Sequence, residues 1–256
     1  MTPSLRILIG SVLAAGLWFI AASASAGVPD LPKDSYKKAA AADLAFLKMR
    51  LAELAPKDKV LDGQLKPALG AAMLLAAYAD VIDDPTLKAE ALKVAEALTK
   101  KDIKGGLEIA KKMTIKPGAG GKAGGDMPKL AKYELTEIMS PYRGKSVGGY
   151  NIDRDIKDMV KTMNPTKIDP AELEVLAVRT AVISEYAIHF PNDKASVKAD
   201  NKAKWVKWSK ESVDLSKQIA AEASKGAKAD EKKLRMLLTN LNARCTDCHN
   251  AFRDDE

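Results

Sequence analysis

The chain has 256 residues, of which 46% are apolar and 29% charged, and its formal net charge is +7. This composition is rich enough in apolar residues for a packed core and excludes an intrinsically disordered protein. Ala, Leu and Lys are abundant and lose little entropy in helices, and no segment alternates Val, Ile and Thr as a strand would. We therefore expect an all-α protein.

The first 26 residues have the pattern of a secretory signal peptide. Arg6 precedes an uncharged apolar run at residues 7–22, and residues 24–26 (Ala-Ser-Ala) are typical of a cleavage site. The apolar run is shorter than the ~20 residues of a membrane-spanning helix, so we expect cleavage rather than an uncleaved anchor. No cysteine follows the run, so a lipid anchor is not expected. The mature chain should be a periplasmic protein without an integral membrane segment.

Four helices are predicted before residue 115. Apolar residues at alternating steps of four and three predict a helix over residues 40–54, stopped by Pro56. Residues 65–82 are apolar nearly all round, so this helix should be central. Two further helices are expected over residues 85–100 and 103–113.

A glycine-rich stretch then divides the chain. Residues 116–128 contain five glycines and two prolines, and they lack the Gly-Lys-Ser/Thr ending of a phosphate-binding loop. We interpret them as a linker between an N-terminal helical region, residues 27–115, and a C-terminal domain, residues 129–256. A short helix is predicted over residues 130–139.

The C-terminal domain shows the most regular helical pattern. Asp169 can cap a helix that has Pro170 at its first position. The next helix carries Trp205 and ends near Gly226, and the last begins near Asp230. Short connections predict antiparallel neighbours in a bundle. Both halves consist of amphipathic helices, so a duplication is an alternative, although no residue-by-residue repeat is found.

Cys245 and Cys248 are the only cysteines, and His249 is one of two histidines. On a helix, residues at i and i+3 share one face and i+4 lies beside them. Two thiols at this spacing can add across the two vinyl groups of one haem, and the adjacent imidazole can then reach the iron. The sequence therefore predicts one covalently attached haem c.

Other readings of this cluster fit less well. Zinc needs four ligands, and only His189 remains to complete a set. A thioredoxin-like pair belongs beside a parallel sheet, and a disulfide between Cys245 and Cys248 would close a loop too small to constrain the chain much.

Residues 234–253, LRMLLTNLNARCTDCHNAFR, resemble the C-terminal helix of class II c-type cytochromes, the cytochrome c′ group. Phe252 and Arg253 match that family's aromatic and basic positions after the histidine. The resemblance is good over residues 169–253, weaker over 129–168 and absent before. It implies a four-helix-bundle haem domain with an additional N-terminal helical region. By the same resemblance, Cys245 and Cys248 hold the haem and His249 is the proximal ligand.

The resemblance leaves two site residues open. Arg253 would put positive charge beside the proximal pocket, or would only complement the helix dipole. The family's first helix supplies the distal face, and its equivalent here is expected in residues 151–163, with Met159 as the leading distal ligand. The alternatives are Met163, Met139, Met49 and His189.

The distal ligand decides the function. A methionine would give an electron carrier with a raised potential, whereas an open iron would suit a small gas such as nitric oxide. A peroxidase would need a distal acid–base group that the chain hardly offers, so we do not expect an enzyme.

We expect a redox partner protein, which the net charge of +6 without Arg6 suggests is acidic, and a homodimer is an alternative assembly. Other readings of the positive charge are a solvated surface or an anionic membrane surface, whereas nucleic acid is disfavoured.

Overall fold

The computed structural model describes residues 27–120 and 133–253. Within these residues the chain forms ten α-helices, three short 3₁₀ helices and no β-strand, which confirms the predicted all-α class. The α-helices are α1 (Lys33–Leu54), α2 (Asp62–Ile82), α3 (Pro85–Thr99), α4 (Ile103–Lys112), α5 (Leu135–Ile138), α6 (Ile152–Met159), α7 (Pro170–His189), α8 (Asp193–Ser196), α9 (Ala199–Ala223) and α10 (Glu231–Phe252). The 3₁₀ helices are η2 (Ser140–Tyr142), η3 (Lys145–Val147) and η4 (Gly226–Lys228).

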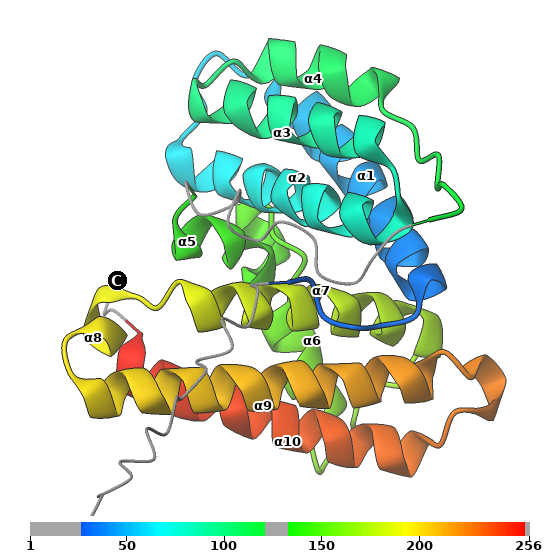
Figure 1. Ribbon diagram of the computed structural model, residues 1–256, viewed down its shortest axis with the longest axis vertical. Coiled ribbons are helices and arrows are strands. Elements are labelled where there is room, and N and C mark those ends of the chain that lie inside the picture. Colours follow the sequence, from blue (N-terminus) through cyan, green and yellow to red (C-terminus); the bar gives the residue numbers. More distant parts are fainter. Residues whose placement is uncertain (1–26, 121–132, 254–256) are drawn as a thin grey trace, which may run out of the picture.

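The helices α1 to α4 form the N-terminal layer of the fold, in which α2 contacts α1 and α3, and α4 packs against both α3 and α1 (Figure 1). Nearly every side chain of α2 from Leu65 to Ile82 is buried, as the all-round apolar sequence predicts. Among the described residues, α2 alone is long and apolar enough to cross a membrane, and 89% of its most apolar window is buried inside the protein. Its composition is therefore accounted for by its place in the core.

Helix starts follow the capping residues. The Asp84 carboxylate accepts a hydrogen bond from the backbone N–H of Leu87, 2.9 Å away, at the start of α3. Asp169 caps α7 and Asp230 caps α10 in the same way. A side-chain oxygen at this position satisfies an amide that has no partner within the helix.

The helices α7, α9 and α10 form the second layer and run antiparallel to their neighbours (Figure 1). The predicted bundle of four helices is present only in part, because the described residues contain three long helices here and the eight-residue α6 packs on α10. The helix predicted over residues 130–139 is also shorter. In the described part it is the single turn α5, which ends at Ile138 ahead of Pro141.

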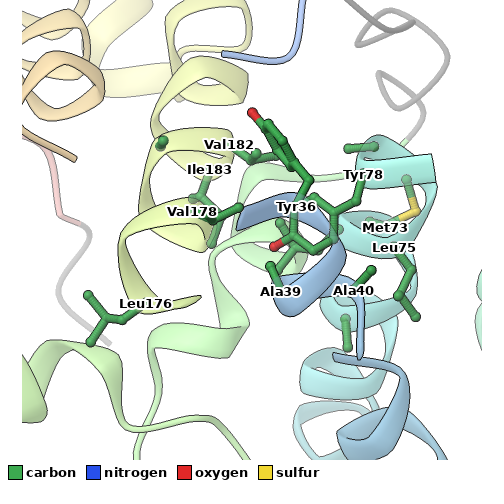
Figure 2. Close-up of a cluster of buried hydrophobic side chains, with 14 of the residues drawn as sticks. Tyr36, Ala39, Ala40, Met73, Leu75, Tyr78, Leu176, Val178, Val182 and Ile183 are labelled. Carbon is green, nitrogen blue, oxygen red and sulfur yellow. The ribbon is translucent and has the colours of Figure 1, made fainter. Parts of the chain in front are cut away.

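The two layers share one hydrophobic core. The helices α1 and α2 contact α7, and α2 also contacts α5 and η2. Figure 2 shows Tyr36 and Ala39 of α1 between Tyr78 of α2 and the side chains of Val178 and Val182 of α7. All five side chains are almost completely buried. Both layers therefore bury apolar surface against each other.

Charged side chains also join α1 to α7. The Glu174 carboxylate, 2% exposed, accepts hydrogen bonds from Ser35 at 2.6 Å and Lys38 at 2.7 Å. Further along both helices, the fully buried Asp43 pairs with Arg179 at 2.6 Å. The contacts advance in the same direction along both helices, so α1 and α7 lie parallel at this junction.

Only part of the predicted linker is described. Residues 116–120 are not helical, and hydrogen bonds from Lys116 N to Asp84 and from Gly120 N to Asp83 hold them against the α2–α3 turn. Residues 121–128, like the predicted signal peptide, lie outside the described residues.

Candidate functional site

Cys245, Cys248 and His249 lie on α10, where Leu234, Leu237 and Leu241 form the buried stripe that leads to them. All three half-buried side chains line one cavity. About 60 Å³ of the cavity is free space that water-sized molecules could occupy. The structure thus brings the three residues of the Cys-x-x-Cys-His motif to one site, on the face that the helical spacing predicts.

The other cavity walls come from elements far apart in the sequence. Residues from the α5–η2 segment, α6, α7, α9 and α10 complete the lining: Met139, Tyr142, Asp153, Ile156, Ile183, Ser184, Ala187, Trp205, Trp208, Ser209, Ser212, Asn242 and Arg244. Most of the lining is apolar or aromatic, which is the usual surrounding of a large planar cofactor.

Aromatic side chains close the cavity near the end of α10. The Trp205 ring packs edge-on to Phe252, with centroids 5.5 Å apart, and Trp208 lies 5.8 Å from the same ring. The indole N–H of Trp205 donates a hydrogen bond to the Ala187 carbonyl at 2.5 Å, so the buried ring has a satisfied polar atom. Phe252, at a position of the family resemblance, therefore packs at the cavity wall.

The two thiols are unsuited to a reactive redox pair. Burial raises the pKa of Cys245 to about 12 and that of Cys248 to about 11, so both are protonated at neutral pH. Catalytic Cys-x-x-Cys pairs instead carry a thiol of lowered pKa. Both cysteines are free in the structure.

The surroundings of His249 favour the neutral form of its imidazole. Burial lowers its pKa, and the positive charges of Arg253 and Lys157 lower it further, against the opposing charge of Asp153. A neutral ring nitrogen can donate its lone pair to a metal. Arg253 itself is exposed at the end of α10, where its carbonyl accepts a hydrogen bond from Lys194 at 2.8 Å.

Of the five distal candidates, only Met139 lines the cavity. Met159 is buried in the main core, and its carbonyl accepts a hydrogen bond from Arg235 at 2.6 Å, near the start of α10. Met163 is 81% exposed and Met49 is 60% exposed. His189 lies at the end of α7, with its ring nitrogen 3.1 Å from Glu185. The structure does not bring Met159, the leading candidate of the sequence analysis, to the cavity.

Several lining residues were not singled out from sequence, among them Tyr142, Ser209 and Ser212. Tyr142 is half-buried, and this burial raises its pKa. The serines lie on the buried face of α9, in line with Trp205. Small polar residues in an otherwise apolar stripe leave space between helices, and this signal could have indicated the cavity.

Within residues 27–120 and 133–253, no three His, Cys, Asp or Glu side chains gather as a metal site would require. A haem iron needs fewer protein ligands, because the porphyrin supplies four nitrogens. No family model matches the chain, and no curated protein or solved structure is significantly similar to it.

Proposed function

We propose that this protein is an exported c-type cytochrome that holds one covalent haem c and transfers electrons in the periplasm. The observation that carries the proposal is the convergence of Cys245, Cys248 and His249 on one mainly apolar cavity. Two thiols, one imidazole and a lining of this kind match the chemistry of haem c attachment.

Each residue has a distinct task in this proposal. Cys245 and Cys248 hold the group through thioethers, and His249 supplies the proximal nitrogen. Trp205 and Phe252 shield that end of the cavity from water. When bound, the haem supplies a one-electron couple, and Arg253 adds positive charge close to His249, as its effect on the histidine pKa indicates.

Met139 favours an electron carrier over a gas-binding protein. Met139 is the methionine in the cavity lining. It lies in the α5–η2 segment, whereas His249 lies on α10. Methionine opposite histidine raises the potential of a haem iron and suits electron transfer. An open, five-coordinate site that binds nitric oxide is the alternative if Met139 does not coordinate.

The proposed location and partner rest on the sequence. Residues 1–26 would direct export and be removed, which leaves a net charge of +6 and favours an acidic redox partner.

The central test is a pyridine haemochrome spectrum of the protein produced together with a c-haem maturation system. We expect one haem per chain that stays attached after denaturation and solvent extraction. The Cys245→Ala, Cys248→Ala double variant should lose it while circular dichroism shows that the helices remain. Wild-type protein that keeps no haem through extraction would exclude the proposed function.

A further inference from the structure

The central helix of the N-terminal layer touches the chain segment that carries Met139. Gly70 of α2 faces this segment so closely that a Cβ there would lie 2.8 Å from Cδ of Pro141 and 2.9 Å from the carbonyl oxygen of Glu137. Neither a proline ring nor a backbone carbonyl can move away as a flexible side chain would. Glycine therefore allows this approach, and any larger residue would push the segment.

The two contacted residues stand on either side of Met139, two positions before it and two after it. The backbone between them is compact, because Met139 N bonds to Leu135 O at 2.8 Å and Tyr142 N bonds to Met139 O at 3.0 Å. A displacement at Glu137 and Pro141 would thus be carried to Met139. Both Met139 and Tyr142 line the cavity, whereas no residue of α2 is part of its lining.

The α5–η2 segment contains little regular secondary structure of its own and has few other packing partners. It consists of one turn of α-helix and one turn of 3₁₀ helix, and α2 is its most extensive neighbour. Pro141 is also tied by its carbonyl to Tyr150 N at 2.8 Å, and Tyr186 donates a hydrogen bond to Tyr133 O at 2.6 Å. The N-terminal layer therefore packs against the back of the segment that lines the cavity.

We propose that Gly70 is a positioning residue that sets how far Met139 and Tyr142 reach into the cavity. The N-terminal helical region then has a role in the site although none of its residues lines it. This inference rests on the proposed function where it concerns the haem, and on packing alone where it concerns the cavity wall.

The test compares Gly70→Ala with Gly106→Ala in the holoprotein. Gly106 is a matched control in α4, since a Cβ there would lie 3.7 Å from its nearest neighbour, an ordinary contact. We expect amide hydrogen exchange at Met139 and Tyr142 to rise at least about fivefold in Gly70→Ala, as overpacking of a rigid contact predicts. The methionine-to-iron absorption band should weaken and the reduction potential should fall. Gly106→Ala should match wild type in all three measurements.

Exchange and spectrum that stay the same in Gly70→Ala as in Gly106→Ala would overturn the inference. If Gly70→Ala does not fold, Pro141→Ala replaces it, because this change opens a gap under the segment and should also speed exchange at Met139. Unchanged exchange there would overturn the inference equally. Wild-type protein without haem would remove the proposed function, while the exchange measurements would still decide whether α2 positions the wall.

Discussion

Met139 and Met159 differ in what surrounds their side chains, although both are buried or half-buried methionines near the C-terminal layer. Met139 lines the cavity with His249, whereas Met159 packs in the main core. We predict that Met139→Leu removes the methionine-to-iron band, lowers the potential and opens the iron to nitric oxide.

Met159→Leu is the matched control for Met139→Leu. It should leave the haem spectrum unchanged, and both variants should lose less than about 1.5 kcal/mol of stability, because Leu and Met have similar volumes. Absorption spectra with and without nitric oxide, together with urea denaturation, measure these effects. A Met139→Leu protein that keeps the methionine band would show that another residue coordinates.

At the level of single residues, the sequence pointed directly to one side of the candidate site, whereas for the other side Met139 was only one of several alternatives. Cys245, Cys248 and His249 are neighbours on one helix, so helical geometry alone brings them together. Met139 is one of several methionines that look alike in the sequence. Its place depends on a short turn, a proline and the packing of α2 more than 60 positions earlier, which no local pattern encodes.

At the level of elements, the connection between α9 and α10 depends on Glu222. Its carboxylate, only 3% exposed, accepts hydrogen bonds from Lys225 and Lys233 and from the backbone N–H of Asp230. These bonds lower the Glu222 pKa from 4.5 to about 2. Three donors on one carboxylate fix the start of the helix that carries the candidate site.

We predict that Glu222→Gln destabilises the protein at pH 7. Because the folded-state pKa is lowered, the stabilisation is complete above about pH 4.5 and is lost as the pH falls towards 2. The difference between variant and wild type in denaturant midpoint should therefore shrink over that range. Glu108→Gln, which breaks the exposed pair with Lys111, should have little effect at any pH. An equal difference in denaturant midpoint between Glu222→Gln and wild type at pH 7 and pH 2.5 would contradict the stabilising role of the ionised Glu222 carboxylate.

The starts of α3, α7 and α10 were predictable because a capping residue marks them, whereas α1 begins at Lys33, before the predicted residue 40, and has no side-chain cap. Asp-Pro pairs open α3 and α7, Asp230 opens α10, and the apolar spacing continues through each helix. Between residues 133 and 160, α6 and α5 lie within the ranges 151–163 and 130–139 where helices were expected, whereas the short 3₁₀ helices η2 and η3 were not predicted. Their turns are too short for a periodic pattern and are held by partners on other helices.

For the whole molecule, the buried pair of Asp43 and Arg179 joins the two layers. Asp43 is fully buried, the Arg179 side chain is 11% exposed, and the guanidinium lies 3.9 Å from the centre of the Tyr150 ring. We predict that Asp43→Ala costs about 3–5 kcal/mol, because it leaves Arg179 as an unpaired buried charge. Urea denaturation followed by circular dichroism measures the cost.

Replacing both Asp43 and Arg179 should lower the stability of the protein much less than replacing Asp43 alone. Asp43→Leu combined with Arg179→Met should recover most of the lost stability, since apolar side chains of similar size remove both charges. Glu96→Ala, at the exposed pair with Lys100, should change stability by less than about 1 kcal/mol. A cost below about 1 kcal/mol for Asp43→Ala would mean that the pair does not hold the layers together.

The parallel contacts between α1 and α7 also bear on the order in which the chain is made. Ser35 and Asp43 meet partners that lie 139 and 136 positions later. Synthesis proceeds from the N-terminus, so α1 is complete long before Glu174 and Arg179 exist, and its apolar face has no second layer to cover it. The α7-facing surface of α1 therefore stays uncovered until the chain has reached residues 174–179.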